Sequence, residues 1–271
     1  MTRKSLGWKK PNTEQRIRAL LRAHPEAGES ILAGITPAPS SDLLPYTCEL
    51  DQKNLGACTA NGIAQGVYIA EGVAGITAAV LARLWLYWEE RALEGTTDQD
   101  VGANIGDGYR ILAGKGIPPE TACPYDVAKF AQDPGPEVDR EAFDSRGKID
   151  VNYHPISSTG SALLTDIEKA LTAKMAVVFG SLVSEAFCSQ QPSGTIMPGT
   201  NDVVAGGHCR AIIGHDRANR RLKVKNSWGD DWSDPTAGPG CSWDSYDWAT
   251  DPKWGYSDIW IVQALPKGIG Q

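Results

Sequence analysis

Four polar residues in this sequence stand in an order that could support chemistry by a cysteine nucleophile. Gln52 lies six residues before Cys58 in the stretch DQKNLGACTANG. His208 follows Cys58 by 150 residues, and Asn226 follows His208 by 18. A catalytic thiol needs a base that takes its proton, a group that orients the base, and N–H donors for an oxyanion. We predict Cys58 as nucleophile, His208 as base and Asn226 as orienting group. The Gln52 amide and the Cys58 backbone N–H are the predicted oxyanion donors.

The predicted secondary structure would bring these residues together from distant parts of the chain. Cys58 begins an expected buried helix, CTANGIAQGVYIAEGVA, whose positive N-terminal end favours a thiolate. His208 heads an apolar strand, HCRAIIGHD, and Asn226 ends the next strand, RLKVKNS. Strands joined by a turn place such ends side by side, so the Asn226 carbonyl could accept a hydrogen bond from the imidazole. Trp228, two residues on, could shield that bond from water.

The remaining elements predict an α+β fold, with a helical half followed by a β-rich half. Helical patterns cover 13–23, 77–94, 105–115 and 161–175, and strand patterns cover 176–183 and 256–265. The Pro, Asp and Gly-rich residues 126–148 are expected to be a loop and a junction. We therefore divide the chain into an N-terminal extension and linker (1–40), a helical lobe with the nucleophile (41–150) and a β-rich lobe with His and Asn (151–271).

The composition of the 271 residues excludes several classes of protein. A net charge of −7 and a pI near 5.2 argue against binding to nucleic acid or to an anionic membrane surface. No apolar run is long enough to cross a bilayer, and the N-terminus lacks a secretory pattern, so a cytoplasmic location is expected. The six cysteines show no zinc spacing, so neither a metal nor another cofactor is predicted.

The local motifs around the four residues resemble those of the papain-like cysteine peptidases. DQ…GAC carries the family's Gln and Cys, GGH its His, and KNSWG its Asn, with GANIG…Y and ETACPYD between them in the family's order. The sequences LGACTANGIA and RLWLYWEERALEG are most similar to those of the bacterial and phage branch of the family. The resemblance covers roughly residues 40–265.

The resemblance implies a papain-like fold with a cleft between two lobes and a peptide or protein substrate. Hydrolysis would proceed through a thiolate–imidazolium pair and a thioester, without a cofactor. The resemblance also assigns substrate contacts to three residues, Gly106, Gly207 and Trp228.

The sequence departs from the family's pattern at several positions. Leu55 and Ala103 stand where the family usually has a disulfide, and a chain among reduced thiols could tolerate that loss. Thr59 replaces the aromatic residue after the nucleophile, and Ile105 replaces the first glycine of the substrate-binding pair. Residues 233–253 form a Trp-bearing insertion that is a candidate border of the cleft.

Other interpretations of the same residues remain open at this stage. Cys58 alone could be a small buried hydrophobe, and His208 alone a core histidine; only the combination favours catalysis. The same chemistry could act on peptidoglycan or on an isopeptide bond. The fold could also serve as a non-catalytic component of a virion or larger assembly, with its cleft blocked by the insertion or by the N-terminal arm. Cys209 is expected to be a buried strand residue, and the five tryptophans between 228 and 254 are expected to pack in the core.

Overall fold

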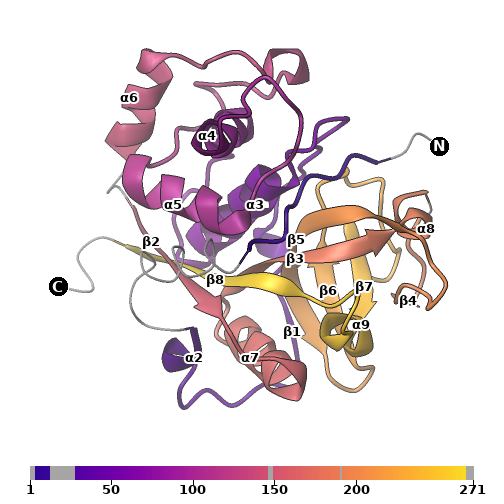
Figure 1. The fold of residues 1–271 in the computed structure, drawn as a ribbon. Coiled ribbons are helices and arrows are strands. Elements are labelled where there is room, and N and C mark those ends of the chain that lie inside the picture. Colours follow the sequence, from indigo (N-terminus) through magenta and orange to yellow (C-terminus); the bar gives the residue numbers. More distant parts are fainter. Residues whose placement is uncertain (1–3, 13–27, 146–148, 190, 267–271) are drawn as a thin grey trace.

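A computed structural model describes residues 4–12, 28–145, 149–189 and 191–266, and its elements confirm an α+β fold (Figure 1). The predicted helix over 13–23 lies outside the described residues. The helices are α2 (Gly28–Ile31), α3 (Cys58–Val73), α4 (Arg83–Glu94), α5 (Ile105–Lys115), α6 (Pro136–Ser145), α7 (Gly160–Thr172), α8 (Glu185–Ser189) and α9 (Tyr246–Thr250). The strands are β1 (Ser40–Asp42), β2 (Ile149–Ile156), β3 (Ala176–Ser184), β4 (Thr195–Ile196), β5 (Val204–Asp216), β6 (Arg221–Lys225), β7 (Cys241–Ser245) and β8 (Ser257–Pro266).

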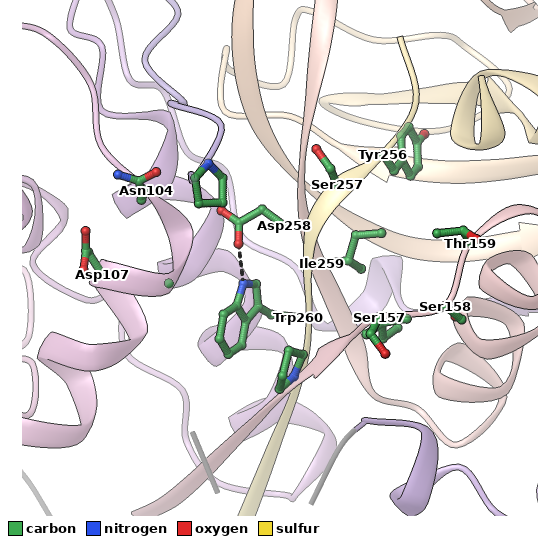
Figure 2. Close-up of a pocket in the computed structure, with 14 residues that line it drawn as sticks. Asn104, Asp107, Ser157, Ser158, Thr159, Tyr256, Ser257, Asp258, Ile259 and Trp260 are labelled. Carbon is green, nitrogen blue, oxygen red and sulfur yellow. Dashed lines mark hydrogen bonds between the residues drawn. The ribbon is translucent and has the colours of Figure 1, made fainter. Parts of the chain in front are cut away.

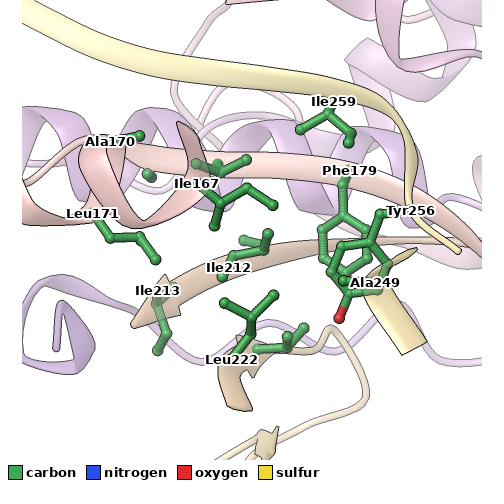
Figure 3. Packing of buried hydrophobic residues seen from close by; sticks show 14 of the residues in the cluster. Ile167, Ala170, Leu171, Phe179, Ile212, Ile213, Leu222, Ala249, Tyr256 and Ile259 are labelled. Carbon is green, nitrogen blue, oxygen red and sulfur yellow. The ribbon is translucent and has the colours of Figure 1, made fainter. Parts of the chain in front are cut away.

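The described strands form one sheet in the order β2-β8-β3-β5-β6-β7-β4, and β1 pairs with β5 as well. Side chains alternate between its two faces along β3. Val178 packs in the cluster formed with α3, α4 and α5, whereas its neighbour Phe179 packs in the cluster on the opposite face. Figure 3 shows Phe179 among the residues of this second cluster, together with Ile167 and Leu171 of α7. Helices therefore cover both faces of the central strands, and β5 lies in the middle.

Two glycines let α3 approach the sheet closely enough to place its first residue, Cys58, beside β5. A methyl group at Gly62 would lie 2.6 Å from the Cys209 sulfur, and one at Gly66 would lie 2.8 Å from Val178. These glycines lower helix propensity, but they permit the close packing that fixes the position of the helix. The predicted helix is therefore confirmed, and its glycines have a packing role.

Two predicted boundaries were wrong, each for a tertiary reason. The α4 helix begins at Arg83 instead of residue 77, because Val80 and Ala82 hydrogen-bond to the extended segment 118–120. Residues 126–148 are not all loop, since α6 packs its buried Ala142 there. The insertion 233–253 contributes β7 to the sheet and also forms α9. All five tryptophans between 228 and 254 are buried, as the packing interpretation predicted.

A buried ion pair fixes β5 to β7 two residues beyond His208. Arg210 donates to Asp244 at 2.7 Å, and both side chains are fully buried. The Asp244 carboxylate also accepts from Tyr256 at 2.7 Å and from Ser242 at 2.8 Å. Because both side chains are fully buried, removing one member would leave the other with an uncompensated buried charge.

No helix in the described part of the chain has the length and hydropathy that a membrane crossing requires. No group of three or more His, Cys, Asp or Glu side chains there is arranged to hold a metal ion.

We predict that Asp244→Ala lowers the free energy of unfolding by about 3–5 kcal/mol, because Arg210 would remain charged and buried without its partner. Urea denaturation measures this loss. The control is Asp247→Ala, which removes the exposed ion pair with Arg220 and should cost no more than about 1 kcal/mol. Equal losses in the two variants would contradict the structural role of the buried pair.

Candidate active site

His208, Asn226 and Trp228 form one contiguous buried group at the ends of β5 and β6. The His208 Nε2 atom lies 2.8 Å from the Asn226 Oδ1 atom. The Trp228 ring stacks on the imidazole with 4.5 Å between ring centroids and 18° between planes. All three residues are at most 3% exposed, so water is excluded from the hydrogen bond. The structure thus brings the predicted base, orienting group and shielding tryptophan together.

The hydrogen bonds around Asn226 define which imidazole nitrogen is available. The Asn226 Oδ1 atom also accepts from the Ser227 backbone N–H at 2.8 Å, so it is an acceptor and the imidazole Nε2 must donate. Burial and the charge of Arg210 lower the pKa of His208 to about 3, and the ring is therefore neutral at pH 7. A neutral ring that donates from Nε2 has a bare lone pair on Nδ1. Nδ1 has no hydrogen-bond partner in the described part of the chain, so it is free to accept a proton.

Cys58 is the first residue of α3 and is fully buried against β5. The backbone N–H of Cys209, the residue after His208, hydrogen-bonds to its sulfur. The backbone N–H groups of Gly7 and Trp8 contact the same sulfur from the other side. Burial nevertheless raises the pKa of the Cys58 thiol to about 12. With this arrangement the sulfur is a neutral thiol at pH 7, although three N–H donors surround it.

The burial of the sulfur comes from residues 4–12, which we call the N-terminal arm. In Figure 1 the indigo arm passes between the α3–α5 helices and the sheet. Gly7 accepts from the Ala103 N–H at 2.8 Å, and Lys9 donates to the Ala103 carbonyl at 2.8 Å. On the opposite side, Trp8 donates its backbone N–H to the Gly207 carbonyl at 3.1 Å. The arm is therefore hydrogen-bonded to both walls of the space over Cys58.

Gln52 also contacts the arm. Its side-chain Nε2 donates to the Ser5 carbonyl at 3.1 Å and to the Leu55 carbonyl at 3.0 Å, and its Oε1 accepts from the Ser227 hydroxyl at 2.7 Å. The Ser227 bond fixes the orientation of the amide, so its N–H groups point toward the arm. A main-chain carbonyl oxygen thus occupies the position in front of the predicted oxyanion donor.

The structure places the predicted substrate contacts in different surroundings. Gly207 lies at the arm, as described, whereas Gly106 lies in the first turn of α5 and lines a neighbouring cavity of about 280 Å³. The backbone pairing with the arm is made by Ala103, which the sequence marked only as a lost disulfide position. A cleft blocked by an N-terminal arm was among the interpretations of the sequence, but the contacts of the arm were missed, because a short segment without periodicity carries no signal for its binding site.

No family model matches the chain. An uncharacterised peptidase C1-like protein, L477 of Acanthamoeba polyphaga mimivirus, is 33% identical over 229 residues, which cover 82% of this chain and 71% of that protein. The structure is similar to that of xylellain, a cysteine protease from Xylella fastidiosa, with a TM-score of 0.81, 23% identity and 98% of each chain covered. It is also similar to procathepsin B S9 from Trypanosoma congolense, with a TM-score of 0.63, 16% identity, and 97% and 84% of the two chains covered.

We predict that Gly7→Ala in the full chain exposes the Cys58 thiol. A methyl group at Gly7 would lie 1.7 Å from the Gly56 carbonyl oxygen, so the arm must shift. Overpacking of this kind favours departure of the arm from Cys58. We therefore expect iodoacetamide to label Cys58 roughly 10–100-fold faster at pH 7.5. Mass spectrometry of the Cys58 peptide gives the rate. Gly114→Ala is the control, because no heavy atom lies within 4 Å of its added methyl group. Equal labelling of Cys58 in the two variants would contradict the position of the arm.

We also predict that alkaline pH weakens closure by the arm. Burial raises the pKa of the covered Cys58 thiol from about 9 to about 12. Above pH 9 the uncovered site therefore loses the single proton that sulfur and imidazole share, whereas the covered thiol retains its proton. The stabilisation of the covered state is complete below pH 9 and is lost as the pH rises toward 12. The labelling rate of the natural chain should rise toward that of Gly7→Ala by up to about tenfold per pH unit above pH 9. A constant ratio of the two rates from pH 8 to 10.5 would contradict this prediction.

Proposed function

This chain belongs to the papain-like (C1) family of cysteine peptidases, and we propose that it hydrolyses peptide bonds with Cys58 as nucleophile and His208 as general base. The 33% identical viral relative, which the chain matches over 71% of its length, establishes the family. The observation that carries the residue assignment is the neutral imidazole of His208, whose bare Nδ1 is on the side away from Asn226. A base oriented in this way has one proton to gain, and the Cys58 thiol has one to give.

The proposed reaction begins when the arm leaves the cleft and water lowers the pKa of the thiol. His208 takes the thiol proton, and the Cys58 sulfur attacks the carbonyl carbon of the scissile bond. The imidazolium then gives the proton to the leaving amine as the tetrahedral intermediate collapses to a thioester. A water molecule, deprotonated by His208, attacks the thioester and releases the acid and the thiol. Asn226 keeps the ring in one orientation during both steps, through its hydrogen bond to Nε2.

Two N–H donors are proposed to hold the developing oxyanion, the Gln52 side chain and the Cys58 backbone. The Ser5 carbonyl, 3.1 Å from Gln52 Nε2, supports this role because a peptide oxygen already accepts a hydrogen bond there. The Gln52 amide is held by Ser227 and Leu55 independently of the arm. Its donors would therefore need no reorganisation when a substrate replaces the arm, which is the condition for strong oxyanion stabilisation.

We propose that the covering arm is inhibitory. It uses the Gln52 amide, the Gly207 carbonyl and the Ala103 backbone, which are the groups that an extended substrate would use. The backbone N–H groups of Gly7 and Trp8 act on the Cys58 sulfur, and burial keeps that sulfur a neutral thiol. A neutral thiol is a poor nucleophile, so the arm can stay in the cleft without being cut.

Several finer assignments extend the proposal. A bacterial or phage-type branch is supported by the similarity to a viral relative and to a bacterial structure. The cytoplasmic location, the association with a virion and the division into lobes at residues 40 and 150 stay predictions. The peptide or protein nature of the substrate follows from the family, whereas a cell-wall or isopeptide bond is the alternative that a substrate panel separates.

We predict that full-length Gly7→Ala cleaves internally quenched peptides at pH 7, whereas the additional change Cys58→Ser lowers the rate by at least about 10³-fold. Cys209→Ser is the matched control, because it removes the neighbouring buried thiol but keeps the backbone N–H that contacts Cys58. Its rate should stay within about tenfold of the parent. Cleavage of peptidoglycan fragments but of no peptide would replace the proposed substrate class. Cleavage that survives Cys58→Ser would remove Cys58 from the mechanism.

A further inference from the structure

We propose that the cleft contains a slot that selects a tryptophan side chain of the substrate, and that Asp258 is the residue that determines this specificity. This inference rests on the proposed peptidase function and names its substrate class. The indole slot consists of Gly180, Gly207 and Asp258, and the arm residue Trp8 occupies it in the covered state.

The walls of the slot are shaped for a flat ring. A methyl group at Gly180 would lie 2.0 Å from the Trp8 ring, and one at Gly207 would lie 2.7 Å from it. The ring therefore lies directly against backbone on β3 and β5, at two positions where only glycine leaves enough room. Trp8 is 5% exposed and packs in the same cluster as Cys58. The slot thus opens next to the nucleophile, where a substrate side chain would enter it.

A local distortion of β8 positions the Asp258 carboxylate at the end of the slot. Val178 pairs with Trp260 and Gly180 with Ser257, so one β3 residue faces both Asp258 and Ile259. Asp258 has a φ of 53°, a left-handed conformation that is rare outside glycine. Such bulges occur beside active sites, where they re-aim a side chain. Here the bulge turns the carboxylate between two indoles.

The carboxylate is built to accept from an indole in the slot. Asp258 Oδ1 accepts from Trp260 Nε1 at 2.8 Å, a bond that Figure 2 shows, and Oδ2 accepts from Trp8 Nε1 at 3.2 Å. Trp260 belongs to the sheet and stays when the arm leaves, so it keeps the carboxylate oriented. The second oxygen then faces the slot, where an incoming N–H group can replace that of Trp8.

The shape and the carboxylate together favour tryptophan over other side chains. Phenylalanine would fill the flat slot but leave Oδ2 without the N–H group that Trp8 supplies. Leucine would cover less of the backbone surface at Gly180 and Gly207 than a flat indole and would supply no N–H group. Arginine would supply N–H groups, but its guanidinium covers less of the apolar wall than an indole. Loss of one hydrogen bond to a charged group lowers the binding affinity roughly tenfold.

The first test measures the Trp8–Asp258 contact without relying on catalysis. In the full chain, Trp8→Phe and Asp258→Asn should each raise the rate of iodoacetamide labelling at Cys58 about tenfold. Trp8→Phe removes the indole N–H donor, and Asp258→Asn replaces one of the two accepting oxygens with an NH2 group that cannot accept from an indole. The double variant should label no faster than the faster single variant. If the labelling rate of the double variant rises by the product of the two single increases, the two residues act independently. That result would overturn the assignment of the slot.

The second test measures selection of the substrate. Full-length Trp8→Ala, in which the slot is empty, is given quenched peptides that differ at one position between Trp, Phe, Leu and Arg. We expect cleavage at a fixed distance from Trp, with kcat/KM at least about tenfold above the Phe peptide. The added change Asp258→Asn should remove that preference. Asp139→Asn is the control. Asp139 lies in α6 and accepts a hydrogen bond from a different indole, that of Trp85, at 2.9 Å. This change should leave the preference for the Trp peptide intact.

The outcomes separate this inference from the proposed function. Equal cleavage of all four peptides, or a preference for Arg, would overturn selection of tryptophan and leave the peptidase intact. Labelling of Cys58 without cleavage of any peptide would overturn the proposed function, and the inference would fall with it.

Discussion

The close packing of α3 on β5 is the constraint on which the rest of the site depends. Gly62 allows the helix to lie against Cys209, so that the Cys209 N–H reaches the sulfur of Cys58. The residue before Cys209 is the proposed base, His208. A side chain at Gly62 would push the helix away and separate the sulfur from the strand that carries the imidazole. The chemistry therefore depends on a helix–sheet distance, which no local motif around the cysteine could set alone.

The described structure is a chemically silent state of this site. Burial beneath the N-terminal arm raises the pKa of the Cys58 thiol and lowers that of His208, so that both groups are neutral at pH 7. An uncovered thiolate–imidazolium pair holds the same single proton as a covered thiol and neutral imidazole. Closure near neutrality therefore moves a proton between the two groups without taking one from solvent. This equivalence explains how a short segment could silence the nucleophile without a large electrostatic cost.

Much of the fold and of the candidate site could be predicted from the sequence, because those parts rest on local patterns. The helix after Cys58 and the strands that carry His208 and Asn226 are apolar segments of the length and composition expected for a buried helix and buried strands. The start of α4 was mispredicted, because pairing of residues 80–82 with residues 118–120 overrides helix propensity. The arm contacts at Ala103 and the turn of Asp258 toward the cleft arise from pairing between distant segments, and the composition of these segments carries no sign of it.

Trapping the acyl intermediate tests the central claim most directly. Full-length Gly7→Ala is mixed with a peptide nitrophenyl ester, quenched in acid within seconds and digested for mass spectrometry. The account predicts a mass increase equal to the acyl group on the peptide that contains Cys58, and no such increase when His208→Ala is added. An acyl group on the peptide that contains Cys209, or on Cys58 at the same level without His208, would contradict the account.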